Sequence, residues 1–423
     1  SMKTILISGA SIAGTTLAYW LHRYGFDVTV VERAPAPREG GYAVDVRGPA
    51  LRVLQRMGLE AQARARNTDT EATVFLDERG KRGATMSGGF GVIDPRDIEI
   101  MRGDLVRVLY DATRNDVRYQ FSDSIRTLEQ DASGVHVTFQ EGPARTFDLV
   151  VGADGMHSNV RRLCFGDEAP FIHHLGSYMA IFTVPNYLKL DRLQYMFSAP
   201  GRVVSVKSTN GNAELKVTAF FSSPKLDYDY RDIPAQRALT AAAFADTGWE
   251  LPRLMREMLD APDFYFDSTS QVRMPRWAVG RGTLVGDAAV CPSPLAGQGS
   301  SMALVGAYVL AGELAARRGD ALAALDSYEK RTRAFMQQNQ QVSEELADGF
   351  APNTSFGIWV RNRSLALMRF IPGSERIMLF FMRNLIRAVN GIELPDYAPT
   401  QLPAAESGVG SGTPALSAAA SSS

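Results

Sequence analysis

The fold of this protein is decided by residues 3–33, which read KTILISGASIAGTTLAYWLHRYGFDVTVVER. A β-branched apolar run ends at Gly9, a helical apolar pattern follows over residues 13–24, and a valine-rich run covers residues 27–33. A strand, a tight turn, a helix and a strand within about 30 residues predict a βαβ unit with parallel strands and a right-handed crossover. The expected fold class is therefore α/β.

The turn of this unit carries a dinucleotide-binding pattern, Gly9-Ala-Ser11-Ile-Ala13-Gly14, with serine at the usual middle glycine. Glycines allow the tight turn and the close approach of helix and strand, so that N–H groups and the helix dipole face a pyrophosphate. Glu32 ends the second strand, where a carboxylate can accept both hydroxyls of an adenosine ribose. Because this carboxylate would repel a 2′-phosphate, we expect FAD or NAD here rather than NADP.

Two later segments place small residues and an acid directly after a buried strand. They are DLVVGADGMHSNVR at residues 148–161 and LVGDAAVCPSPLAGQG at residues 284–299. Ligands of open α/β sheets bind outside the carboxyl ends of the strands, so both segments are candidate cofactor contacts. Asp287 could accept hydrogen bonds from a polyol chain, and the turn at 297–299 could offer N–H groups to an electron-rich ring. For Asp154, a plain strand-to-helix turn is the alternative.

Residues 170–275 differ in pattern from the chain on either side. Short β-type runs alternate there with turn clusters such as STNGN, which favours an antiparallel sheet inserted into the α/β body. From Pro395 onward, Pro, Ala, Ser and Gly dominate, so a disordered tail is expected. The predicted α/β domain is discontinuous and covers residues 2–169 and 276–350. The inserted sheet covers residues 170–275, the C-terminal helices cover 351–394, and the tail covers 395–423.

The charge and the cysteine content argue against several classes of function. A total of 45 Lys and Arg against 46 Asp and Glu leaves no basic excess for a nucleic acid. The two cysteines, Cys164 and Cys291, exclude a disulfide framework and favour a reducing, cytoplasmic location. We expect no transmembrane segment and no metal site, since the five histidines contain no HxxxH pattern. The run 377–389 could form a membrane-surface helix, although we expect it to pack on the body of the protein.

In this order, the three motif segments resemble group A FAD-dependent monooxygenases of the para-hydroxybenzoate hydroxylase fold, and among them the tetracycline-inactivating flavin monooxygenases. The resemblance covers roughly residues 3–390 and is tightest at 3–33, 148–161 and 281–315. It implies a Rossmann-like FAD-binding domain with an inserted antiparallel-sheet substrate domain and a C-terminal helical segment. The sequence departs from many members of the family at Val290, where they have histidine.

The resemblance also implies roles for individual residues. The implied FAD contacts are Gly9, Ser11, Ala13, Gly14, Glu32, Arg33, Asp45, Arg102, Asp154, Gly286, Asp287, Pro294, Gly297, Gln298 and Gly299. Arg38 and Arg47 are implied contacts of NADPH or NADH. Arg202 is an implied substrate contact, although a turn-surface arginine is the interpretation we favour there; the same alternative exists for Arg102. The predicted sheet adds Phe182 and Phe220 as substrate contacts, although only alternate strand residues can face one pocket.

The activity that the resemblance implies is hydroxylation of an aromatic or polyketide-like small molecule. NAD(P)H would reduce a non-covalently bound FAD, and O₂ would then form a flavin hydroperoxide that transfers one oxygen atom. No catalytic side chain is required by this chemistry, and none is assigned. A FAD-dependent reductase or dehydrogenase without oxygen transfer is the alternative, and a non-catalytic flavoprotein is a third reading. The sequence contains one dinucleotide-binding unit, so NAD(P)H is expected to bind transiently at the surface.

Overall fold

The first layer of the protein is a six-stranded sheet in the order β17-β18-β11-β1-β2-β7. The structure, a computed structural model, describes residues 1–91 and 93–397. The strands of this sheet are β1 (Thr4–Ser8), β2 (Asp27–Glu32), β7 (Arg118–Phe121), β11 (Leu149–Gly152), β17 (Ala278–Val279) and β18 (Gly282–Leu284). Strand β1 pairs in parallel with β2 and with β11, and its residues Ile5 to Ile7 are fully buried. The predicted βαβ unit is confirmed, with α1 (Ile12–Arg23) as the crossover helix.

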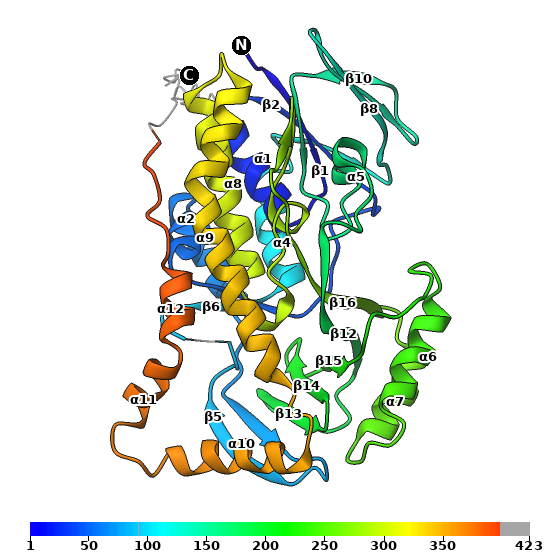
Figure 1. Cartoon of the computed structure of the whole chain (residues 1–423), viewed down its shortest axis with the longest axis vertical. Helices are drawn as coiled ribbons and strands as arrows, with labels where there is room; N and C mark the ends of the chain where they lie inside the picture. Colours follow the sequence, from blue (N-terminus) through cyan, green and yellow to red (C-terminus); the bar gives the residue numbers. More distant parts are fainter. Residues whose placement is uncertain (92, 398–423) are drawn as a thin grey trace, which may run out of the picture.

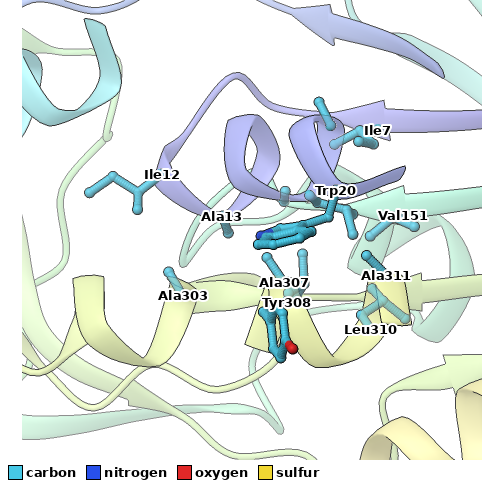
Figure 2. Packing of buried hydrophobic residues seen from close by; sticks show 14 of the residues in the cluster. Ile7, Ile12, Ala13, Trp20, Val151, Ala303, Ala307, Tyr308, Leu310 and Ala311 are labelled. Atoms are coloured by element: carbon cyan, nitrogen blue, oxygen red, sulfur yellow. The ribbon is translucent and has the colours of Figure 1, made fainter. Parts of the chain in front are cut away.

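Helix α1 packs against α8 (Gly299–Ala316), the core helix of this layer. In Figure 2, Trp20 of α1 lies over Ala307 and Tyr308 of α8, and the Trp20 and Tyr308 rings are 5.0 Å apart in an edge-to-face arrangement. Small residues on α8, such as Ala303 and Ala311, allow the two helices to approach closely. Among the described helices, α8 alone has the length and apolar composition of a membrane span, yet most of it is buried in this core.

The second layer is a seven-stranded sheet in the order β16-β12-β15-β14-β13-β4-β5. Its strands are β4 (Ala72–Leu76), β5 (Arg82–Ser87), β12 (Ile172–Pro185), β13 (Leu193–Ala199), β14 (Arg202–Thr209), β15 (Glu214–Ser222) and β16 (Tyr265–Val272). The five strands from the predicted insertion pair antiparallel with one another. Strands β4 and β5 come from the first predicted domain and extend this sheet, because β4 pairs in parallel with β13. The boundary at residue 169 therefore does not separate the two layers.

Helices α6 (Ile233–Ala243) and α7 (Leu251–Asp260) cover one face of the second sheet (Figure 1). The 30-residue helix α9 (Ala321–Phe350) runs from the first layer to the second and ends with Phe350 against Phe220 of β15. The remaining elements are β3 (Ala43–Val46), α2 (Pro49–Arg56), α3 (Glu60–Ala65), β6 (Ile98–Met101), α4 (Arg102–Asp111), β8 (Ile125–Asp131), β9 (Gly134–Phe139), β10 (Arg145–Phe147), α5 (Asn159–Phe165) and the 3₁₀ turns η1 (Gly286–Ala288) and η2 (Pro294–Ala296).

The C-terminal segment consists of α10 (Ser355–Met368), α11 (Ser374–Phe381) and α12 (Arg383–Val389). Helix α12 buries Leu385, Ala388 and Val389, but α11 buries no residue. The expectation that the whole run 377–389 packs on the body is therefore wrong for α11. The predicted tail from Pro395 begins too early, because Tyr397 packs against Tyr308 of α8; residues 398–423 lie outside the described residues.

Candidate functional site

The turn between β1 and α1 presents backbone rather than side chains. A Cβ on Gly14 would lie 1.9 Å from the Gly9 carbonyl oxygen, so no larger residue fits. Ser11 caps α1, because its hydroxyl accepts the Gly14 N–H at 3.1 Å and donates to the Ala153 carbonyl oxygen at 2.8 Å. The serine at the middle position thus binds the turn to the end of β11. The first N–H groups of α1, including that of Ala13, lack intrahelical partners and can face a phosphate.

Glu32 lies at the end of β2, beside this turn. Its two carboxylate oxygens accept the N–H groups of Ala10 at 3.2 Å and Ala34 at 2.7 Å. A carboxylate has about four lone-pair sites, so acceptor capacity remains for ribose hydroxyls. The neighbouring Arg33 points to solvent, and the structure gives it no contact in this site.

Arg102 begins α4 and brings a positive charge to the site. Its side chain makes no hydrogen bond or ion pair with another residue in the described part of the chain, yet it is only partly exposed. Burial lowers the pKa of the guanidinium, while Tyr42 and, more weakly, Glu32 are close enough to raise it. A half-buried arginine without an anionic partner is unusual and suits a phosphate. Arg102 is therefore not a plain surface arginine.

Asp287 lies across from Arg102, in the turn η1 after β18. Gly286 lets this turn pack on α1, since a Cβ there would lie 2.8 Å from the Ala13 Cβ. The Asp287 carboxylate is open to solvent, but the surrounding protein partly desolvates it and raises its pKa to about 6, an effect that the hydrogen bond from Cys291 and the charge of Arg102 offset in part. It also faces the N-terminus of α8, whose first turn has no acidic residue. The exposed carboxylate can therefore accept hydroxyl groups of a bound polyol.

The Asp154 carboxylate is engaged in hydrogen bonds within the protein. Its carboxylate accepts the Ser8 hydroxyl at 3.2 Å and the N–H groups of Asn159 and Val160 at 3.0 and 3.1 Å, and also the Ser158 hydroxyl. These bonds join the end of β1 to the start of α5. The side chain is used within the protein, so the geometry favours the plain strand-to-helix turn.

A buried polar chain supports the loop that carries Pro294 and Gly297. Asp45 of β3 forms an ion pair with Arg47 at 3.1 Å, and Arg47 donates to the Gln298 side chain at 3.1 Å. A Cβ on Gly297 would lie 2.7 Å from the Asp45 carboxylate. The side chains of Arg47 and Gln298 are 3% and 0% exposed. Both side chains support this loop from the interior of the protein. Arg47 therefore does not lie at the surface, where we expect a transiently bound nucleotide, whereas Arg38 is exposed there.

The two faces of the second sheet separate the predicted substrate contacts. Phe220 lies on the face that packs against Tyr42 and Leu295, next to the loop described above. Phe182 is completely buried on the opposite face, under α6 and α7. Arg202 also belongs to that face and pairs with Asp246. The predicted substrate contact at Phe182 is therefore wrong, and at Arg202 the geometry disfavours the substrate role, in line with the interpretation that we favour from the sequence, because strand alternation turns both side chains away from the cradle.

Several residues of this face were missed from the sequence. Met179 and Ile181 of β12 lie beside Phe220, and Tyr42 and Phe350 close the cluster. Met179 is the direct cross-strand partner of Phe220. The alternation of side chains along β12 would therefore have predicted Met179 on this face, but only with the register of the two strands known. In the part of the chain that the structure describes, no group of three or more His, Cys, Asp or Glu side chains could hold a metal ion.

The donor set of this cradle fits FAD. The glycine turn and α1 can hold a pyrophosphate, Glu32 can accept from a ribose, Arg102 can pair with a phosphate, and Asp287 can accept from a ribityl chain. The spaces beside Gly9 and Gly14, which a Cβ would fill, are the close-approach positions of such a site.

Comparison with known proteins gives the same answer. The family model described as FAD binding domain matches residues 2–343. An uncharacterized protein of Mycobacterium tuberculosis is 48% identical over 354 residues, covering 83% of this chain and 95% of the relative. A flavin-dependent monooxygenase of Legionella longbeachae is 38% identical over 397 residues, covering 93% and 98%. The crystal structure of the tetracycline destructase Tet(51) superposes with a TM-score of 0.82 at 34% identity, covering 94% of this chain and 100% of that one. The chain therefore belongs to the FAD-binding-domain family and is a flavin-dependent monooxygenase.

Proposed function

We propose that this enzyme uses NAD(P)H and O₂ to hydroxylate an aromatic or polyketide-like small molecule. The observation that carries the proposal is the apolar wall of Met179, Ile181 and Phe220, which faces Tyr42 and Leu295 of the cofactor-binding layer. Bound FAD supplies the redox chemistry by carrying electrons from NAD(P)H to O₂. Tet(51), 34% identical to this chain, is named a tetracycline destructase, which supports a substrate of this class.

The residues of the chain then have three tasks. The glycine turn, Glu32, Arg102 and Asp287 hold the cofactor non-covalently. The apolar wall orients a flat substrate and excludes water from the space between the layers. No side chain needs to act as a nucleophile, and we assign none.

The nicotinamide nucleotide is proposed to bind transiently. Arg38 is exposed and lies near enough to Arg102 to lower its pKa, so the two arginines can attract a phosphate-bearing ligand. Arg47, buried in its ion pair, takes no part. We also propose a cytoplasmic location, because Cys164 and Cys291 are both free thiols.

The experiment is a screen of aromatic natural products for stimulated NADPH oxidation, with O₂ uptake measured in parallel and products analysed by mass spectrometry. We expect products that contain one added oxygen atom, and an anaerobic flavin reduction that a true substrate accelerates. Product formation that persists without O₂ would instead identify a reductase. Phe220→Ala should raise KM for that substrate while leaving substrate-free flavin reduction unchanged.

A further inference from the structure

Helix α10 presents a second apolar face that no other segment among residues 1–91 and 93–397 covers. Its inner face packs on β5 and β13. On the outer face, Phe356, Trp359, Val360 and Leu367 are 73%, 58%, 40% and 52% exposed. Spacings of three, four and eleven residues place these four side chains along one side of the helix. A soluble surface helix would carry polar residues at these positions.

The exposed apolar surface continues through the next turn into α11. The further exposed side chains are Phe370, Ile371, Ile377, Leu379, Phe380 and Phe381. Ten of the seventeen exposed large apolar side chains among the described residues therefore lie between residues 356 and 381. Figure 1 shows α10 and α11 together at one end of the molecule, on the side away from the first layer. We call this surface, defined by the ten side chains, the C-terminal apolar surface.

The charge of the same segment is strongly positive. Residues 351–390 contain six arginines and one acidic residue, Glu375, which gives a net charge of +5 in a chain whose total is −1. Two of these arginines lie directly against the exposed rings, Arg369 over Phe370 at 4.5 Å and Arg383 over Phe380 at 4.1 Å. Arg363 is exposed on the outer face of α10. Cations are thus interleaved with aromatic rings.

We propose that the C-terminal apolar surface binds the headgroup region of an anionic lipid bilayer. In this arrangement, the aromatic and aliphatic side chains would insert at the boundary between the lipid headgroups and the acyl chains. The arginines would contact the lipid phosphates. A second copy of the chain is the less favoured occupant, because two surfaces of net charge +5 would repel each other. The contacts of α10 with β5 keep the helix folded before it meets the membrane.

The test is sedimentation of the full chain, loaded with FAD, with vesicles of phosphatidylcholine alone or mixed with phosphatidylglycerol. We expect binding to the anionic vesicles, weakened by salt, and a blue shift of tryptophan emission that Trp359→Phe abolishes, since Trp20 and Trp277 are buried and the partly buried Trp249 is stacked on Phe197. Phe356→Ser combined with Phe380→Ser should weaken partition about tenfold or more. The matched control is Leu259→Ser combined with Leu322→Ser, which are exposed at 53% and 62% elsewhere and should change nothing.

Four outcomes would overturn the proposal. Absence of vesicle binding is the first, and equal binding to neutral and anionic vesicles is the second. Self-association that the Phe356 and Phe380 substitutions abolish would make a second copy the occupant. Binding that appears only after removal of residues 398–423 would show that the end of the chain covers the surface. None of these results depends on monooxygenase activity, so the proposed function is tested separately.

Discussion

The two faces of the seven-stranded sheet carry similar apolar side chains but differ in what packs against them. On the closed face, alternate residues such as Phe182 and Phe221 pack with α6 and α7 into a continuous core. On the open face, Met179, Ile181 and Phe220 meet only a few side chains, from Tyr42, Leu295 and Phe350. Both faces are apolar, so hydrophobicity does not distinguish core from binding wall. Helices α6 and α7 cover the closed face, whereas on the open face α10 covers only the end of the sheet at β5 and β13 and leaves the Met179–Phe220 region free of such a cover.

The comparison leads to a simple rule for mutations in this protein. Changes on the closed face should lower stability and spare ligand binding, because those side chains fill a packed interior. Changes on the open face and in the cradle should alter ligand binding and lower stability less. Three of the four predictions below test this rule, and the one on His157 tests the link between the two layers.

The largest effect is expected for Phe182→Ala. The side chain is completely buried on the closed face, so its removal should lower the free energy of unfolding by about 3–5 kcal/mol. Phe220→Ala, one strand away, should lower it by only about 1–2 kcal/mol, because its cavity opens toward the cradle. Urea denaturation of both apo variants measures the difference. Equal losses would mean that the two faces are not distinct.

Asp287→Ala should weaken FAD binding without destabilising the apoprotein. Loss of a hydrogen bond to a charged acceptor costs about 1.5–3 kcal/mol, or roughly a ten- to hundredfold increase in Kd. Asp287→Asn keeps one acceptor oxygen and should lose less. Fluorescence titration with FAD measures both variants, alongside the melting temperature of the apo forms. An unchanged Kd for the alanine variant would remove Asp287 from the cofactor site.

His157 is expected to couple the two layers in a pH-dependent way. It lies after β11 and bridges Asp267 of β16 at 2.9 Å and Glu168 at 3.1 Å, and these two hydrogen bonds raise its pKa from 6.5 to about 10. The contribution of the charged His157 to the free energy of unfolding is complete below pH 6.5 and is lost as the pH rises toward 10. Because His157 is half-exposed, we expect this contribution to be only about 1 kcal/mol. The melting temperature of the wild type should fall more than that of His157→Gln across this range; parallel curves would contradict the bridge.

The smallest effect is expected for Arg202→Ala. Arg202 pairs with the exposed Asp246 and donates to the Ala243 carbonyl oxygen at 3.1 Å, all on the closed face. Its loss should shift the melting temperature slightly and leave KM for a true substrate within about twofold of the wild-type value. Steady-state kinetics of the wild type and the Arg202→Ala variant measure this KM. A large increase in KM would place Arg202 at the substrate after all.

The sequence alone predicted the cofactor cradle because its residues lie at the ends of buried strands. Gly9, Ser11, Gly14 and Glu32 are close together in the chain, and local geometry brings them into one turn. Asp287 follows a buried strand in the same manner. For such residues, the strand pattern determines the side of the sheet on which they emerge, and little else is needed.

Only the tertiary structure decided which side chains of the second sheet face the cofactor-binding layer and which ones support the loop at Gly297 from within the protein. Phe182 and Phe220 look equivalent in sequence, and the pairing of β12 with β15 and the position of α6 and α7 separate them. Arg47 looks like a surface arginine until Asp45 and Gln298 enclose it. Strand parity, burial and ion pairing depend on contacts between distant segments, because they are properties of the packed layers rather than of any one stretch of chain.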